Sequence, residues 1–391
     1  MDASLFIAGR LRFKGKMAMI SVAVSFLVMI IAVSVSSGFR REIRSGLSML
    51  SGDVQIMPVT MNLLDENSPI EKDASYVPYI KEVPGVKEII PVAYRAGIIK
   101  NGQDIHGVLF KGTADGVASA DSVSLPVSIP SRLSEIAGLK SGDRMLAYFV
   151  GDNVKARQFN IVSVYDAMVE TDDRLVVYAD IADIQRINGW GEDQVSSIEV
   201  LLEPEAGSRG NIEDIGNEIG FLTNSYTTED ETSVVAVSSV SRYPQLFDWL
   251  QLIDFNVLFI LILMTIVAGF NMISGLLIML FENISTIGLL KSLGMTDRAI
   301  SKVFLSSSAV LVLKGMAAGN LLAVLFCLIQ DTTHVLRLNP ENYFVSFVPV
   351  DLDIPMIIAA DAIAFAVVML LLRIPCMFIA KVDPADTVRV R

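Results

Sequence analysis

The chain has 391 residues, of which 52% are hydrophobic and only 19% are charged. This composition is too apolar for an ordinary soluble domain and too charged for a protein that lies wholly in the bilayer. The net charge is −12, and residues 40–254 alone carry 18 basic and 33 acidic side chains. Such an acidic segment argues against nucleic acid as a partner, because phosphate binding needs basic patches.

Four apolar runs are long enough to cross the bilayer as helices, because about 20 apolar residues span its hydrocarbon core. The runs cover residues 17–39, 254–282, 303–330 and 354–380. Lys314 interrupts the third run, and Asp361 and Arg373 interrupt the fourth. The first run could instead be a signal peptide, but the apolar part of a signal peptide has only about 7–15 residues. We therefore expect a retained span.

Basic residues near the ends of the runs predict the orientation, since they concentrate on the cytoplasmic side. They precede the first span, separate the second from the third and follow the fourth: Arg10, Arg12, Lys14, Lys16, Lys291, Arg298, Lys302, Lys381, Arg389 and Arg391. The loop between the third and fourth spans has only Arg337. We therefore expect cytoplasmic termini. Three arginines just after the first span depart from this pattern: Arg40, Arg41 and Arg44.

The predicted fold is a membrane protein with four transmembrane α-helices and a large mixed α/β extracytoplasmic domain between the first and second. The predicted parts are a cytoplasmic N-terminal segment (1–16), the first span (17–39), a periplasmic α/β domain (40–250), the second span (254–282), a cytoplasmic coupling helix (283–302), the third span (303–330), a periplasmic loop (331–353), the fourth span (354–380) and a cytoplasmic tail (381–391).

Short β-rich runs bounded by Gly, Asp and Pro indicate strands in the α/β domain. The strand candidates are Val54–Pro58, Val108–Lys111, Phe159–Val164 and Ser197–Leu202, and the helix candidates are Ser131–Ala137, Asp180–Asn188 and Ile212–Ile219. His106 has no Cys, His or carboxylate at a metal-ligand spacing, so we expect no metal site there. Neither cysteine, Cys327 or Cys376, lies in this domain, which excludes a disulfide framework.

The segment after the second span carries the strongest functional signal. Ile284, Ile287 and Leu290 recur at helical spacing. Gly294 suits a left-handed helix stop, and Thr296 can cap the next helix. The pattern predicts a short helix at the cytoplasmic surface. It is either a connector that skims the membrane or a lever that a soluble partner pushes.

The stretch FENISTIGLLKSLGMTDRAISKVF at 281–304 resembles the coupling region of FtsX-like ABC permeases, especially the lipoprotein-releasing (Lol-type) permeases. The resemblance extends over nearly the whole chain. It includes SGF at 37–39 with the following Arg-Arg-Glu, SRLSEIAGLKSGDRM at 131–145, YPQLFDWLQLIDFN at 243–256 and the tail AKVDPADTVRVR at 380–391.

The resemblance implies a MacB/FtsX-like permease architecture in the bacterial cytoplasmic (inner) membrane. Such permeases form homo- or heterodimers that work with two copies of a separate ABC ATPase, which binds ATP and Mg. Lol-type systems extract a lipoprotein from the outer leaflet and pass it to a periplasmic LolA-like carrier. The chain has no Walker A motif, because Met17 follows Gly15-Lys16 where a hydroxyl residue is needed. We therefore expect a non-enzymatic subunit that binds no cofactor.

The resemblance also implies site residues. The set that would dock on the ATPase is Ile284, Thr286, Ile287, Gly288, Leu290, Lys291 and Gly294. Within it, Ile287 and Leu290 would supply an apolar knob and Lys291 a charge. The residues that would line the acyl-chain cavity are Phe26, Met29, Phe259 and Met264, although Met and Phe on a span more often serve in packing. A short loop at 188–193 would present Trp190 to an external partner.

Two charges inside the spans need a partner or water. Counting helical rise places Lys314 and Asp361 at similar depths, so we expect an ion pair between the third and fourth spans. A structural tie and proton coupling are both possible roles. Gly315 and Gly319 form a GxxxG pattern that allows close backbone approach. Because the fourth span is rich in alanine, we expect the third and fourth spans to pack together.

Three other functions remain open. A MacB-type mechanotransmitting permease would drive an efflux duct, but that type usually carries a fused ATPase. An FtsX-type regulator of cell-wall hydrolases would have a smaller external domain. A membrane-anchored sensor or scaffold would need no coupling helix.

Overall fold

The computed structural model describes residues 16–61, 69–101, 104–114, 125–151, 154–167, 175–339 and 343–381. The predicted N-terminal segment and C-terminal tail therefore lie almost wholly outside the described residues. The chain divides into two compact units. The helical unit comprises Met1–Arg41, Leu250–Arg337 and Phe347–Arg391, and the α/β unit comprises Glu42–Trp249 and Leu338–Ser346.

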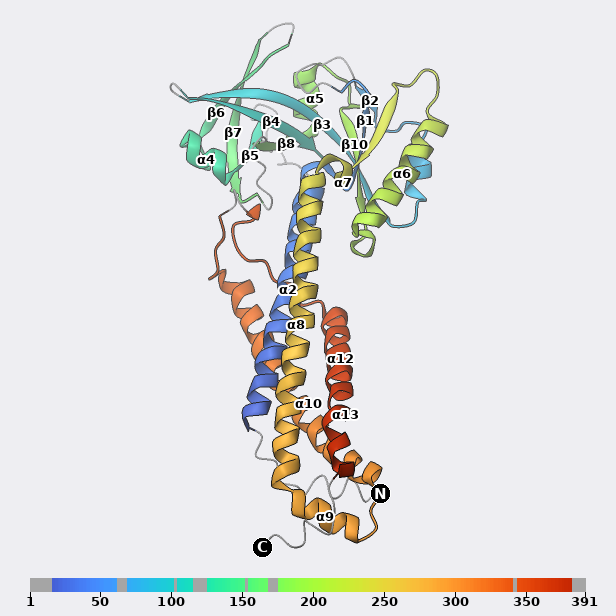
Figure 1. Ribbon diagram of the computed structural model, residues 1–391. Helices are drawn as coiled ribbons and strands as arrows, with labels where there is room; N and C mark the ends of the chain where they lie inside the picture. Colours follow the sequence, from blue (N-terminus) through green and yellow to red (C-terminus); the bar gives the residue numbers. More distant parts are fainter. Residues whose placement is uncertain are drawn as a thin grey trace. The chain divides into compact units, whose positions relative to one another are not determined.

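The long helices are α2 (Lys16–Ser51), α8 (Pro244–Glu282), α10 (Asp297–Thr333) and α12 (Ile354–Leu371), with the short helices α9 (Ile284–Ser292) and α13 (Arg373–Cys376) (Figure 1). Within the described residues, four helical segments are long and apolar enough to cross a membrane: Lys16–Ser51, Pro244–Glu282, Asp297–Thr333 and Ile354–Ile379. The last is divided where α12 ends at Leu371. Pro375 explains this break, because its ring clashes with the carbonyl four residues earlier.

The helical unit is held together by apolar side chains from all four long helices. Phe26 and Met29 of α2 pack in one buried cluster with Met272 of α8, Phe304 of α10 and Val368 of α12. Each of these side chains is at most 2% exposed. Because the cluster combines side chains from four helices, it holds the whole bundle together and not only one pair of helices.

The GxxxG pattern of α10 lies against α2. A Cβ atom placed on Gly315 would come within 2.8 Å of Val22 Cγ1, and one on Gly319 would come within 3.1 Å of Phe26 Cβ. The glycines therefore let the backbones of α2 and α10 approach closely. The expected packing of the third and fourth spans is confirmed, since α10 contacts α12, but the two glycines themselves lie against α2.

The α/β unit is built on one large mixed sheet. Its strands are β1 (Val54–Pro58), β3 (Val86–Asn101), β4 (Asp104–Thr113), β5 (Pro126–Pro130), β6 (Arg144–Phe149), β7 (Lys155–Tyr165), β8 (Val176–Asp180), β10 (Ser197–Leu202) and β11 (Val234–Ser238). In the described part of the chain their order is β11-β1-β10-β3-β4-β8-β5-β7-β6. A separate small pair joins β2 (Ile70–Glu71) to β9 (Gln194–Val195).

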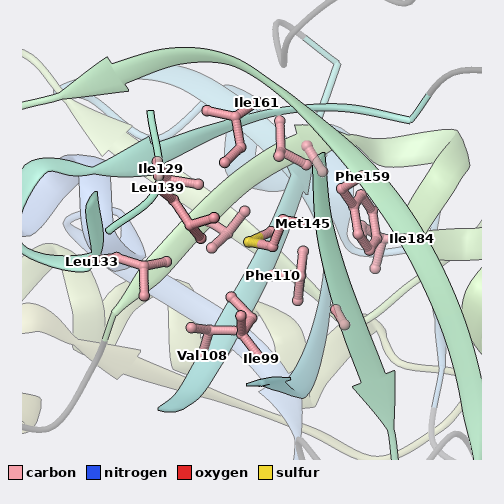
Figure 2. Close-up of a cluster of buried hydrophobic side chains, with 14 of the residues drawn as sticks. Ile99, Val108, Phe110, Ile129, Leu133, Leu139, Met145, Phe159, Ile161 and Ile184 are labelled. Atoms are coloured by element: carbon pink, nitrogen blue, oxygen red, sulfur yellow. The ribbon is translucent and has the colours of Figure 1, made fainter. Parts of the chain in front are cut away.

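Six of these described strands close into a ring, because β6 pairs with β3 as well as with β7. Pairs β4–β8 and β5–β7 are parallel, and the others in the ring are antiparallel. Side chains pointing inward from the ring form a dense core that includes Phe110 and Phe159 (Figure 2). The aromatic ring of Phe149 packs against both of these phenylalanines. Helices α4 (Ser131–Ala137) and α5 (Ile181–Asn188) add Leu133 and Ile184 to this core.

The rest of the sheet, β11-β1-β10-β3, is antiparallel. Helix α6 (Arg209–Tyr226) covers it with Ile212 and Ile219, and Gly216 lets it approach Ser238 of β11. Two short helices, α3 (Val77–Lys81) and α7 (Ser239–Arg242), complete the unit. Tyr243 alone separates α7 from α8.

Candidate functional site

The candidate site is α9 and the turns on either side of it. Asn283 separates α8 from α9, and its side-chain amide donates to the Met279 carbonyl at 2.9 Å. The same carbonyl also accepts from the Asn283 backbone amide at 3.1 Å, so the side chain adds a second donor to the last turn of α8. The backbone of Asn283, at a φ of −108° and a ψ of 20°, departs from helical geometry, and α9 begins after it as a separate short helix.

Gly294 ends α9 as the sequence predicts. Its φ of 86° is left-handed, which glycine adopts without strain. The Gly294 amide donates to the Lys291 carbonyl at 2.9 Å, and the Met295 amide donates to the Leu290 carbonyl at 3.0 Å. These two bonds form a Schellman motif, with Met295 and Leu290 both packed on the helical core. Thr296 then caps α10 by accepting from the Ala299 amide.

The side chains of α9 that are buried and those that are exposed are not the ones that the sequence predicts. Ile287 is 1% exposed and belongs to the core of the helical unit, and Leu290 is partly buried against it. The exposed apolar residues are Leu289 (56%) and Leu293 (75%), with Ile284 at 39%. The expected knob of Ile287 and Leu290 is thus wrong, because these side chains point into the unit's own core. Gly288 is also buried, and Thr286 is half-buried.

Lys291 forms an ion pair with Asp297, the first residue of α10, at 2.9 Å. Its side chain is only 11% exposed. Lys291 was expected to offer its charge to a partner protein, but this charge is paired within the chain. The pair spans the turn at Gly294 and ties the end of α9 to the start of α10.

The structure divides the four residues expected to line a cavity. Phe26 and Met29 are buried between the chain's own helices, and Met264 is partly buried against the same cluster. Phe259 is 61% exposed on α8. Phe26 and Met29 therefore serve in packing in this arrangement, and Phe259 is the residue of the four that a second molecule can reach.

The predicted ion pair inside the spans is replaced by another contact. Asp361 accepts a hydrogen bond from the side-chain amide of Asn320, and the described structure shows no ion pair between it and Lys314. Lys314 is exposed on α10. Asn320 lies six positions after Lys314, which is not a whole number of helical turns, so the two occupy different faces of the helix. The depth estimate was too coarse to distinguish these faces.

Trp190 is also less available than predicted. It is half-buried and packs against the core of the strand ring, and its amide donates to the Gln185 carbonyl at 2.9 Å. Gly189, at a φ of 75°, ends α5 and directs the chain into this turn. Among the described residues, no group of His, Cys, Asp or Glu could hold a metal ion.

Known proteins resemble this chain in sequence along most of its length. Residues 258–384, which contain α9, match the family described as FtsX-like permease C-terminal. The lipoprotein-releasing system transmembrane protein LolC of Xylella fastidiosa is 21% identical over 97% of this chain and 95% of that protein. LolE of Haemophilus influenzae is 21% identical over 95% of this chain and 93% of that protein.

Among solved structures, the periplasmic region of MacB from Actinobacillus actinomycetemcomitans aligns with a TM-score of 0.31 and 13% identity, covering 49% of this chain and 91% of that one. The matched residues contain α9, α10 and α12 and the later part of α8, but not α2. Residues 258–384 thus match the FtsX-like permease family, in a chain that resembles the transmembrane subunits of lipoprotein-releasing systems over nearly its whole length.

Proposed function

We propose that this chain is a permease subunit of an ATP-driven ABC complex that extracts lipoproteins from the outer leaflet of the bacterial cytoplasmic membrane. The observation that carries the proposal is the similarity to LolC over 97% of the chain. That similarity includes the α/β unit as well as the permease domain. The chain itself is not an enzyme; a separate ABC ATPase, in two copies, binds ATP and Mg.

In the proposed orientation, α9 and both termini are cytoplasmic and the α/β unit is periplasmic. The three arginines that depart from the usual charge pattern each have a carboxylate partner, which offsets their charge outside the membrane. The pairs are Arg40–Asp254 at 2.7 Å, Arg41–Asp351 at 3.0 Å and Arg44–Asp53 at 3.6 Å. A second permease subunit, identical or homologous, completes the complex, and a LolA-like carrier receives the lipoprotein.

The α9 helix is the contact with the ATPase in this proposal. Leu289 and Leu293 lie four residues apart, so they share one helix face and offer an apolar surface to a partner. Ile287 on the opposite side anchors α9 in the helical core. Movement of α9 by the ATPase therefore passes to α8 and α10 through Ile287 and the Lys291–Asp297 pair.

The test is to purify the detergent-solubilised protein with its bound partners, identify them by mass spectrometry and reconstitute the complex in proteoliposomes. We expect an ABC ATPase and triacylated lipoproteins to co-purify, and lipoprotein release to require ATP and the carrier. An ATPase found with an outer-membrane duct would indicate a MacB-type permease instead, and one found with a cell-wall hydrolase would indicate an FtsX-type regulator. Recovery without any ATPase would overturn the transport function.

A further inference from the structure

The C-terminal end of α2 is capped inside the α/β unit by a buried lysine. The last carbonyls of a helix have no partner within the helix. Lys111 of β4 donates to the Met49 carbonyl at 2.6 Å and to the Leu50 carbonyl at 3.3 Å, and Tyr178 of β8 donates to the Met49 carbonyl at 3.3 Å. A cation at this end also opposes the negative pole of the helix dipole.

The charge of Lys111 is balanced by Glu199 of β10 at 2.8 Å. The two side chains are 3% and 2% exposed, so water cannot substitute for either partner. The hydroxyl of Tyr94 on β3 donates to the second oxygen of Glu199 and lies 3.3 Å from the Leu50 carbonyl. Three strands therefore hold the last turn of α2 through one charged cluster.

The same cluster reaches the segment that leads into α8. Gln55 of β1 donates to the Tyr94 hydroxyl at 3.5 Å and to Ser197 at 2.8 Å. The guanidinium of Arg242, at the end of α7, donates to the Gln55 side-chain oxygen. One residue, Tyr243, separates Arg242 from α8. The end of α2 and the short helix that leads into α8 are thus bound to the same network, which we call the polar joint: Gln55, Tyr94, Lys111, Glu199 and Arg242.

We propose that the polar joint transmits movement of the first and second spans to the α/β unit, and that Lys111 and Glu199 are its positioning residues. The proposal rests on the proposed ATP-driven function. Helix α2 is continuous from Lys16 to Ser51, so a shift of its membrane part reaches Met49 and Leu50 along the helix. Apolar contacts at that end could slide past one another. Charge-assisted bonds from a buried lysine to these carbonyls constrain the geometry more tightly, and they move the strands with the helix.

The experiment compares the wild-type complex with a Lys111→Met/Glu199→Met variant. Removing both charges avoids an unpaired buried ion, so the unit still folds, whereas either single change risks misfolding. Lys72→Met is the matched control, because Lys72 forms an exposed ion pair with Asp193 in the same unit. Each complex is reconstituted with its ATPase, and lipoprotein released per ATP hydrolysed is measured.

We expect the double variant to hydrolyse ATP at the wild-type rate and to release about tenfold fewer lipoproteins per ATP. The control should match the wild type in both. Unchanged release per ATP in a folded double variant would overturn the proposal. A proportional fall of both rates would overturn it too, because release per ATP is then the same as in the wild type.

A second readout does not depend on the substrate. Hydrogen exchange is followed with and without trapped nucleotide in both complexes. In the wild type, nucleotide should change the exchange of peptides from α2 and from the α/β unit; in the double variant the change should persist in α2 and disappear from the α/β unit. A nucleotide effect on the α/β unit of the double variant equal to that of the wild type would refute the polar joint. A wild-type complex that shows the nucleotide effect but releases no lipoprotein would instead refute the proposed substrate.

Discussion

The ammonium group of Lys291 lies 2.9 Å from a carboxylate oxygen of Asp297, across the tight turn at Gly294. This pair joins the end of α9 to the first turn of α10, where an acidic side chain also suits the helix dipole. Lys291 is largely buried and Asp297 is half exposed, so the pair contributes at most about 1 kcal/mol to stability. Its more important effect is on the position of α9.

The pair predicts equal effects of two different substitutions. Lys291→Met and Asp297→Asn should each lower the rate of lipoprotein release by a similar, modest factor. The double variant should be no worse than either, because both remove the same interaction. Release assays on the reconstituted complex measure this. A Lys291→Met variant that loses ATPase binding while Asp297→Asn retains it would mean that Lys291 contacts the ATPase directly.

The exposed face of α9 predicts where the ATPase binds. Leu289→Asp or Leu293→Asp should weaken binding of the ATPase by about 2 kcal/mol or more, since each places a charge in an apolar contact. Phe221→Asp is the control, because Phe221 is an exposed apolar residue (70%) on α6 of the α/β unit and not on α9. Affinity of the purified ATPase for the solubilised permease is the measurement. Equal losses from Phe221→Asp and Leu289→Asp would argue against this face.

The sequence predicted α9 but not the direction of its side chains. Gly294 ends this helix and Thr296 caps the next one through local chemistry, which needs no knowledge of the rest of the fold. The helix has only nine residues, and apolar side chains occupy both of its faces. Periodicity therefore could not tell the buried Ile287 from the exposed Leu289, and only the packing of the helical unit decides between them.

The α/β unit shows the same division between local and long-range information. The strands Val54–Pro58 and Ser197–Leu202 and the helix Ser131–Ala137 have the predicted bounds, and turn residues delimit each of them. Strand β3 was missed, because Pro91 and Gly97 interrupt its apolar pattern. Its pairing with β6 could not be foreseen, since the partners are far apart in the chain. The Lys111–Glu199 pair could not be foreseen for the same reason, because the two residues are far apart in the sequence.

The contact between α2 and α10 predicts a strict limit on size at Gly319. A methyl group there would press on Phe26 Cβ and the Leu27 amide nitrogen, each within 3.1 Å of the added atom. Gly319→Ala should therefore destabilise the protein by about 1–3 kcal/mol. Ala317→Leu is the control, because Ala317 is exposed on the same helix. Thermal unfolding in detergent compares them; a Gly319→Ala protein as stable as the wild type would contradict the close approach.

The partner of Asp361 predicts how the intramembrane site responds to substitution. Asp361→Asn keeps an oxygen for the Asn320 amide and should be tolerated, whereas Asp361→Ala should cost about 1–3 kcal/mol by leaving that amide without an acceptor. Lys314→Met should have little effect, because Lys314 is exposed and lies on another face. Protein level in the membrane and thermal unfolding are the measurements. Rescue of Asp361→Lys by Lys314→Asp would restore the direct ion pair as the better explanation.

Buried tyrosines predict that the α/β unit loses stability at alkaline pH. Burial, with a smaller contribution from the charge of Glu199, raises the pKa of Tyr178 to about 12, and burial also raises the pKa of Tyr76 and Tyr165. An unfolded tyrosine loses its proton near pH ~10. Between these values the unfolded chain holds fewer protons than the folded one, so the free energy of unfolding falls as pH rises.

The fall should be at most about 1.4 kcal/mol per pH unit for each such tyrosine, and it should be absent below the unfolded pKa. Thermal unfolding of the full chain as a function of pH, with tyrosinate absorbance recorded in parallel, measures it. Tyr178→Phe removes one titrating group and should reduce the slope, at the cost of the bond to the Met49 carbonyl. A slope unchanged by Tyr178→Phe would mean that Tyr178 ionises equally in the folded and unfolded chains, and it would contradict the raised pKa of Tyr178 in the folded unit.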